Sequence, residues 1–148
     1  HDKLMYLGAN LVGKTVDLIS EGNVKTKKQP ELEEKSASKL NPENTKIDWT
    51  DSLDNIYNKI RGLNPFPTAW TSIKNNDKEI TAKLYGVSKE FVKQTDVNGK
   101  ILTTKKTIKV AVQDGYLIIN EIKLSGKKKM ESHNLLNGFQ FSANAKMM

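Results

Sequence analysis

Lysine and arginine side chains form several compact groups in the second part of this chain, and the chemistry open to them is phosphate binding. The candidate residues are Arg61, Lys105, Lys106, Lys127, Lys128 and Lys129. Lysines meet phosphates as point charges and do not read bases, so such a set favours shape-based binding of a folded RNA. A solvated basic rim would explain the same residues equally well.

The excess positive charge is confined to residues 49–148. Residues 1–48 carry eight lysines and eight acidic residues, whereas residues 49–148 carry 16 basic and nine acidic residues, a net charge of +7. A basic domain attracts polyanions and speeds its encounter with them. The charge therefore favours a nucleic-acid partner for the second part of the chain.

Four aromatic residues could stack on bases, but their sequence positions favour another role. Trp49, Tyr57, Phe66 and Trp70 all stand at or beside positions of an apolar face. Aromatic side chains at such positions contribute large buried areas to a core. We therefore predict that these four residues pack in the core rather than bind bases.

The run GANLVGKT, Gly8 to Thr15, matches the phosphate-loop pattern G-x-x-x-x-G-K-T. That loop requires a buried strand before it, and small residues where its backbone wraps around the phosphate. Here the apolar spacing continues through the run without a break, as it does in a helix. We predict a plain helix and no nucleotide site.

No group of residues predicts catalysis or a metal site. His133 could act as a general base, but its place in the first turn of an expected helix favours a surface histidine. Asp48, Asp51 and Asp54 could hold a cation, but carboxylates at a helix start are stabilised there without metal. The chain has no cysteine and two histidines, too few ligands for a zinc site. We expect no catalytic residue and no metal ligand.

The first 46 residues predict one helix and a linker. Apolar residues recur at helical spacing from Leu4 to Ile19, and Gly22-Asn23 is a stop signal, so residues 1–23 are expected to be a helix. Its apolar stripe needs a partner surface, and we interpret it as the end of a domain that is mostly missing. Residues 24–46 are rich in Lys, Glu, Ser and Pro and are predicted to be a linker.

A second helix is predicted over Trp49–Leu63, with Thr50 as its N-cap. It ends in the run IRGLNPFPTAW, Ile60 to Trp70. Pro65 and Pro67 cannot continue a helix, and each pushes the residue before it toward an extended conformation. The run therefore predicts a short, rigid bend from a helix into a strand.

Short strands follow the bend. They are expected at Ala69–Ile73, Glu79–Val87, Lys100–Thr103, Thr107–Val112 and Tyr116–Leu124. Asn98-Gly99 and Asp114-Gly115 are hairpin signals, and a short helix with Leu135, Leu136 and Phe139 facing inward is expected after Gly126. Residues 142–148 are expected to fray. The predicted fold class is mostly β with flanking helices (α+β), and the strands of residues 47–148 are expected to form a small five- to six-stranded barrel.

The sequence resembles the C-terminal part of the methionyl-tRNA formyltransferase family. The motifs that carry the resemblance are IDW at Ile47–Trp49, IRGLNPFPTAW, VAVQDGYLIINEIKLSGKKKM at Val110–Met130, and LLNGF. They occur in the family's order and spacing. The stretch GANLVGKTVDLI is similar to the last helix of that family's catalytic domain, and Thr68 stands where the family often has a smaller or more flexible residue.

The resemblance implies an oligonucleotide-binding-like (OB-like) barrel and a role in translation initiation. The family transfers a formyl group from 10-formyltetrahydrofolate, its co-substrate, to the amino group of methionine on initiator tRNA. Its catalytic residues lie in an N-terminal domain outside this chain. The resemblance therefore implies that residues 47–148 bind tRNA, and that the expected partners are initiator methionyl-tRNA and the chain's own catalytic domain. The lack of cysteine favours a cytoplasmic setting, the Lys- and Asn-rich usage suits a bacterial source, and we expect a monomer.

One alternative stays open at this stage. The same fragment could be a non-catalytic structural or interaction module of another folate-dependent formyltransferase that acts on a small molecule. No apolar run approaches the length of about 18 residues needed to cross a bilayer, and we expect neither a membrane partner nor a signal peptide.

Overall fold

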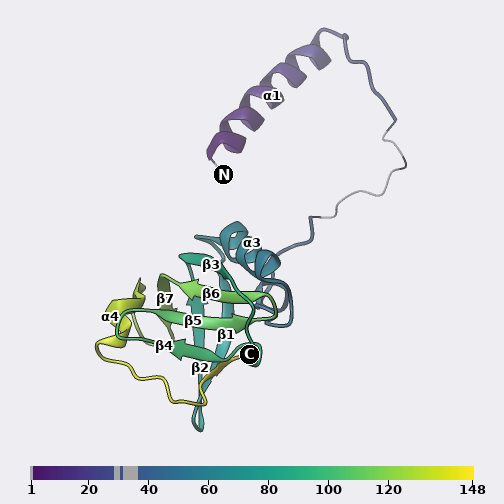
Figure 1. Cartoon of the computed structure of the whole chain (residues 1–148). Helices are drawn as coiled ribbons and strands as arrows, with labels where there is room; N and C mark the ends of the chain where they lie inside the picture. Colours follow the sequence, from purple (N-terminus) through teal and green to yellow (C-terminus); the bar gives the residue numbers. More distant parts are fainter. Residues whose placement is uncertain (1, 29–30, 32–36) are drawn as a thin grey trace. The chain divides into compact units, whose positions relative to one another are not determined.

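The computed structural model describes residues 2–28, 31 and 37–148, and the chain divides into two units, His1–Ala37 and Ser38–Met148. The first unit contains one helix, α1 (Asp2–Ser20), which runs through the GANLVGKT stretch (Figure 1). None of its described side chains is buried within the unit. The helix predicted for this segment is confirmed. No helix among the described residues is both long enough and apolar enough to span a membrane.

The second unit begins with two helices. The short helix α2 (Pro42–Thr45) starts at Asn41, whose side chain accepts the Asn44 N–H, and it lies within the segment that the sequence assigned to the linker. Helix α3 (Leu53–Leu63) has Ser52 as its N-cap, because the Ser52 side chain accepts the Asn55 N–H. The prediction that the helix starts at Trp49 with Thr50 as cap was therefore wrong.

The bend after α3 is held by two hydrogen bonds from Thr68. Its N–H donates to the Leu63 carbonyl at 2.9 Å, and its hydroxyl donates to the Pro65 carbonyl at 2.7 Å. Thr68 has a φ of 78°, a left-handed conformation that is unfavourable for a β-branched residue. The helix-to-strand bend predicted from the two prolines is confirmed.

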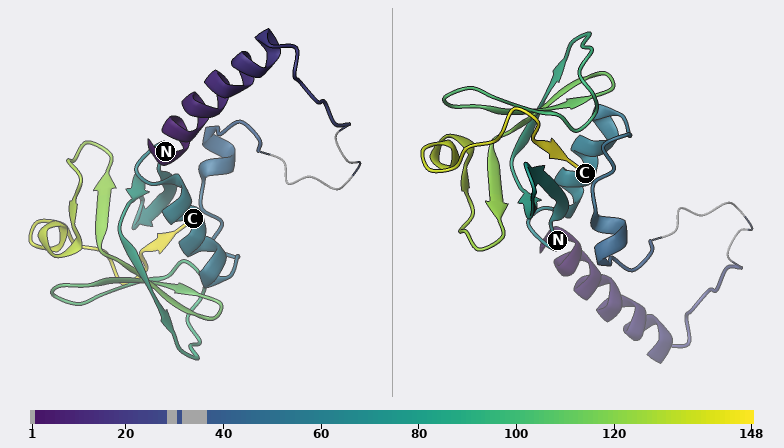
Figure 2. Two further views of the ribbon diagram at one scale, coloured as in Figure 1. Left: turned by 90° about the horizontal axis from the view of Figure 1, so that it is seen from above. Right: turned by 90° about the horizontal axis from the view of Figure 1, so that it is seen from below.

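In the part of the chain that the structure describes, nine strands form two antiparallel sheets around one core (Figures 1 and 2). One sheet has the order β8-β7-β2-β1-β9 and the other has the order β3-β6-β5-β4. The strands are β1 (Ala69–Asn75), β2 (Lys78–Leu84), β3 (Val87–Phe91), β4 (Ile101–Thr103), β5 (Ile108–Val112), β6 (Gly115–Ile119), β7 (Glu121–Leu124), β8 (Met130–Glu131) and β9 (Lys146–Met147). A short helix, α4 (Ser132–Leu136), follows β8.

The predicted α+β class is confirmed, but the described residues show two sheets rather than one closed barrel. The expected long strand Tyr116–Leu124 is divided at Asn120 into β6 and β7, which belong to different sheets. The expected strand Glu79–Val87 ends at Leu84, and β3 was not foreseen. Asp114-Gly115 does connect neighbouring strands, whereas the Asn98-Gly99 turn precedes β4, which does not pair with β3.

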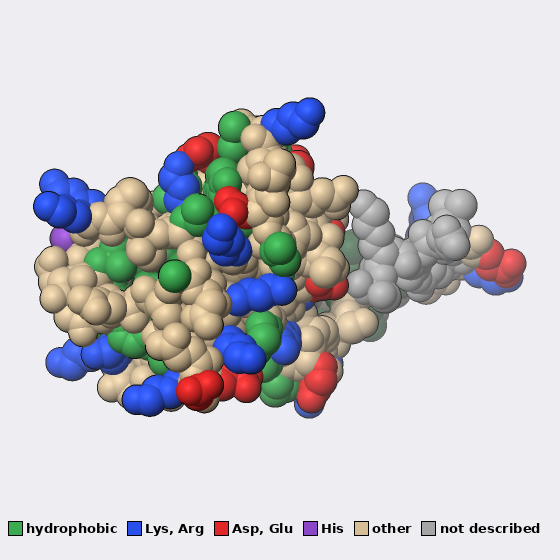
Figure 3. Space-filling view, turned by 60° about the horizontal axis from the view of Figure 1, so that its bottom comes forward, with side chains coloured by type: hydrophobic (Ala, Val, Ile, Leu, Met, Phe, Trp, Pro, Cys, Tyr) green, Lys and Arg blue, Asp and Glu red, His purple; other side chains and the backbone are tan. Residues whose placement is uncertain are grey.

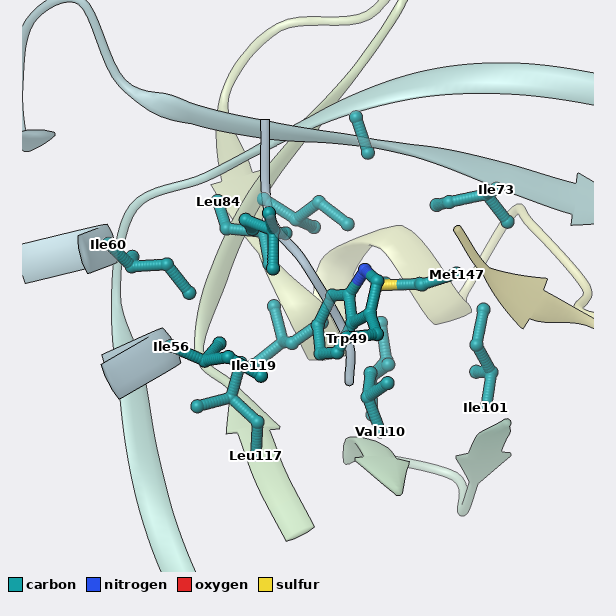
Figure 4. Packing of buried hydrophobic residues seen from close by; sticks show 14 of the residues in the cluster. Trp49, Ile56, Ile60, Ile73, Leu84, Ile101, Val110, Leu117, Ile119 and Met147 are labelled. Atoms are coloured by element: carbon teal, nitrogen blue, oxygen red, sulfur yellow. The ribbon is translucent and has the colours of Figure 1, made fainter. Parts of the chain in front are cut away.

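The core lies between the inner faces of the two sheets, and α3 contributes to it from the side (Figure 4). Ile56 and Ile60 of α3 meet Leu84, Leu117 and other apolar residues of both sheets there. In β5 the side chains of Ile108, Val110 and Val112 are buried, Lys109 between them is half-buried, and Ala111 is buried as well.

The last residues of the chain belong to this core. Met147 is completely buried, and β9 pairs with β1. The Met147 N–H donates to the Gly99 carbonyl at 2.8 Å, and a bridge between Lys100 and Lys146 connects the two sheets. The expectation that residues 142–148 fray was therefore wrong, because a buried apolar side chain and strand pairing hold them.

Gly99 should be the glycine most sensitive to substitution at this junction. It has a φ of 84°, and a β-carbon there would lie 2.2 Å from the Met147 carbonyl oxygen. We expect Gly99→Ala to lower the free energy of unfolding by about 2 kcal/mol or more, as measured by urea denaturation. The matched control is Gly62→Ala in α3, where a β-carbon has free space and should raise stability by about 0.5–1 kcal/mol. Equal stability of the two variants would contradict this role of Gly99.

Candidate nucleic-acid interface

The turn at residues 125–129 presents two of the candidate lysines to solvent. The turn is fixed by hydrogen bonds from the Ser125 N–H to Thr81 O and from the Lys127 N–H to Leu124 O. Lys127 and Lys128 are exposed and have no ion pair among the described residues. Lys129 differs from them, because its Nζ lies 3.2 Å from Glu121 and 5.2 Å from the centre of the Tyr85 ring.

The turn at residues 104–107 presents the second pair of lysines. Hydroxyl groups of Thr104 and Thr107 lie 2.7 Å apart, and the Lys106 N–H donates to Thr104 Oγ1 at 3.2 Å. Lys105 and Lys106 are both exposed. Lys106 lines the same depression as Glu121, the partner of Lys129. The fold therefore brings these two turns to one side of the domain, around α4.

Arg61 is separate from the other candidates. It lies near the end of α3, and Figure 1 shows α3 and α4 on different sides of the two sheets. Its guanidinium donates to Asn58 Oδ1 at 3.3 Å and is exposed. The structure therefore does not place Arg61 in one site with the lysine turns.

A row of residues on the outer face of the five-stranded sheet was missed in the sequence. Trp70 of β1 pairs in register with Lys83 of β2, and Lys83 pairs with Lys123 of β7. Directly paired residues point to the same face of a sheet, and both lysines are exposed. This outer row, Trp70-Lys83-Lys123, crosses β1, β2 and β7. It ends at Lys123 on β7, the strand that leads into the turn at residues 125–129.

An apolar groove adjoins the outer row. It is lined by Phe66, Pro67, Trp70 and Lys83, with Leu40 and Pro42 from the segment before α3, and has a volume of about 670 Å³. Phe66 is 87% exposed, so the prediction that it packs in the core was wrong. Trp49 is buried as predicted, and its indole N–H donates to Thr71 Oγ1 at 2.9 Å.

Basic side chains are prominent on one face of the molecule. Figure 3 shows several lysine or arginine side chains across this face, with apolar and some acidic side chains among them. Interleaved basic and apolar groups suit a ligand that offers both phosphates and flat bases.

Comparison with known proteins identifies the family. Residues 39–140 match the family described as "Formyl transferase, C-terminal domain". The chain belongs to this family. The match begins just after the boundary of the second unit, and the formyl transferase C-terminal domain of this chain therefore corresponds to the unit with the two sheets.

Several curated relatives are methionyl-tRNA formyltransferases of bacteria. The chain is 43% identical to that of Flavobacterium psychrophilum, over 96% of this chain and 45% of the relative. It is 39% identical to that of Bacteroides fragilis, over 99% of this chain and 47% of the relative. The chain is thus a homologue of part of methionyl-tRNA formyltransferase, and it spans about half the length of these relatives.

A solved structure shows the same fold at low sequence identity. A variant of HypX from Aquifex aeolicus superposes with a TM-score of 0.54 at 20% identity, covering 88% of this chain and 24% of HypX. At this sequence identity the match supports the fold of the formyl transferase C-terminal domain, but not a function or a binding site.

The other residues considered as candidate sites in the sequence have ordinary local contacts. Thr15, the last residue of the phosphate-loop pattern, donates its hydroxyl to Leu11 O within α1. His133 is exposed, in the first turn of α4, and lies 3.1 Å from Glu131. Asp48 and Asp51 accept hydrogen bonds near the start of α3, and no described group of acidic or histidine side chains is arranged to hold a metal ion.

Two lysines in or directly beside the strands of the four-stranded sheet are paired with acidic residues. Lys109 pairs with Glu90 at 2.5 Å, and Lys100 pairs with Asp96 at 2.5 Å. Asp96 also accepts the Tyr116 hydroxyl at 2.8 Å. Hydrogen bonds from Lys100 and Tyr116 lower the pKa of Asp96, and the hydrogen bond to Asp96 raises the pKa of Tyr116.

Removing the Asp96 charge should change the titration of Tyr116. In Asp96→Asn we expect the Tyr116 pKa to fall toward its ordinary value of 10.0, because the carboxylate no longer disfavours the phenolate. The measurement is ultraviolet titration of the variant and the wild type, with Tyr116→Phe to identify the Tyr116 component. An unchanged Tyr116 titration in Asp96→Asn would contradict the observed hydrogen bond.

Proposed function

We propose that this chain is the tRNA-binding part of a methionyl-tRNA formyltransferase that acts in translation initiation in the bacterial cytoplasm. The full enzyme would transfer a formyl group from 10-formyltetrahydrofolate to the amino group of methionine on initiator tRNA. The observation that carries the proposal is the identity of about 40% to enzymes of that name, over nearly the whole chain. We propose that it works as a monomer.

The proposal assigns binding and chemistry to different parts of the enzyme. The chain covers about half the length of its curated relatives, and we assign the formyl donor and the catalytic groups to a preceding domain of the full enzyme. Under this proposal residues 1–23 are the last helix of that domain, residues 24–46 connect it to the rest, and residues 47–148 are an OB-like tRNA-binding domain. The exposed apolar side chains of α1 support the first assignment, because an apolar stripe needs a covering surface.

The electrostatics favour tRNA over a small molecule as the ligand of the C-terminal domain. The net charge of +7 lies in residues 49–148, and the exposed lysines stand on turns and on an outer sheet face rather than in an enclosed pocket. A small-molecule site would be a concave pocket with a few converging polar groups. Spread positive charge suits a long polyanion instead.

Replacement of Lys127 and Lys128 should weaken tRNA binding mainly at low salt. In the double variant Lys127→Ala and Lys128→Ala, the slope of log K against log salt for initiator tRNA should decrease in magnitude by about 1.5, because two phosphate contacts are lost. Fluorescence anisotropy of labelled tRNA at several salt concentrations measures this slope.

Lys93→Ala is the matched control for that experiment. Lys93 is an exposed lysine that follows β3 of the other sheet, so its removal should leave the slope closer to that of the wild type. A wild-type slope in the double variant would exclude Lys127 and Lys128 as phosphate contacts, and absence of tRNA binding by the wild type would contradict the proposed function.

A further inference from the structure

The exposure of Phe66 has no explanation in the folding of the domain. Its side chain is 87% exposed, although the residues around it are firmly held. Thr68 donates hydrogen bonds to Leu63 and Pro65, and Pro67 lines the groove beside it. A large aromatic side chain presented by a restrained bend loses little conformational freedom on binding, which is typical of a contact residue.

The groove beside Phe66 has a second aromatic wall with a fixed position. The Trp70 indole N–H donates to the Pro42 carbonyl at 2.8 Å, and this hydrogen bond connects β1 to the start of α2. Leu40, which is 52% exposed, lines the groove as well. The groove therefore offers flat apolar surface over a volume of about 670 Å³, which is ample for one nucleobase.

The charge around the groove is positive. Among the residues that the structure describes, no acidic one lines the groove, and the charged residue in its lining is Lys83. The Nζ of Lys83 lies 3.4 Å from the Pro67 carbonyl oxygen. Lys46 adds a second positive charge, with its Nζ 5.5 Å from the centre of the Trp70 ring. Beyond Lys83, the outer row continues through Lys123 to the turn with Lys127 and Lys128.

We propose that this groove binds one unpaired base of an RNA, stacked on Phe66, while the RNA backbone crosses Lys83 and Lys123 toward the turn at residues 125–129. The inference rests on the proposed function and adds a base-binding site to it. Bases stack on aromatic side chains whatever their sequence, and lysines meet the phosphates between them. The groove with its positive rim matches both requirements, whereas a purely apolar protein partner would leave the lysines unpaired.

The test compares binding of two polyanions, one with nucleobases and one without. The probes are a short unstructured RNA and inorganic polyphosphate, and the protein is the full 148-residue chain. In Phe66→Ala we expect affinity for the RNA to fall about 5- to 150-fold, the range for loss of one stacking contact, with the salt slope unchanged. Affinity for polyphosphate should stay at the wild-type value, because polyphosphate has no base to stack.

Two further variants complete the design. Phe66→Trp should retain RNA affinity, since it keeps an aromatic face. Phe91→Ala removes another exposed phenylalanine, which is 58% exposed on β3, and should leave RNA affinity unchanged. Thermal unfolding of Phe66→Ala should match the wild type, because an exposed side chain contributes little to the core.

The outcomes separate this inference from the proposed function. If Phe66→Ala binds RNA as tightly as the wild type, or loses affinity for polyphosphate equally, the base site is overturned. The proposed function still stands in that case if Lys127→Ala with Lys128→Ala flattens the salt slope for initiator tRNA. If the wild-type chain binds neither RNA nor polyphosphate, both the base site and the proposed function fail.

Discussion

Burial of one apolar core between two antiparallel sheets determines where every functional side chain of this domain points. In a strand, neighbouring residues face opposite sides, so burial of Ala82 and Leu84 in β2 places Lys83 on the outer face. Burial of Ile122 and Leu124 places Lys123 there as well. A shift of the register by one residue would bury both lysines, and the core therefore fixes the outer row.

The same core explains why the two ends of the binding surface are restrained. At one end, α3 packs into the core and its last residue, Leu63, accepts the Thr68 N–H, which holds the bend with Phe66. At the other end, β7 continues into the turn at residues 125–129, which is tied to β2 through Ser125 and Thr81. A base site and a phosphate site on such supports are preorganised, which lowers the entropic cost of binding.

Local sequence signals predicted those structural features that depend on residues close to one another in the sequence. The proline bend, the helix of residues 2–20 and the Asp114-Gly115 hairpin follow from backbone restriction and side-chain period. Strand pairing between distant segments had no such signal: the pairing of β9 with β1 and the burial of Met147 depend on partners more than 70 residues away. The division of Tyr116–Leu124 between two sheets is likewise a property of the tertiary fold.

The candidate site could be predicted only in part, because some of its residues meet through pairing between distant segments. Runs of lysine in turns were visible in the sequence, but the ion pair of Lys129 with Glu121 joins the turn at residues 125–129 to β7 and could not be seen there. The outer row was hidden because Lys83 and Lys123 are 40 positions apart and meet only through the register of β2 with β7. Phe66 was expected in the core from its aromatic character, although a residue between two prolines in a tight bend has little chance to turn inward.

The most direct test of the account is a lysine-reactivity footprint of the chain with and without initiator tRNA. Acylation of each lysine is measured by mass spectrometry, with Lys93 as the reference for general crowding by the RNA. The account predicts that tRNA protects Lys83, Lys123, Lys127 and Lys128 more strongly than Lys93. Equal protection of all five, or protection confined to the four-stranded sheet, would contradict the claim that the outer row and its turn bind RNA.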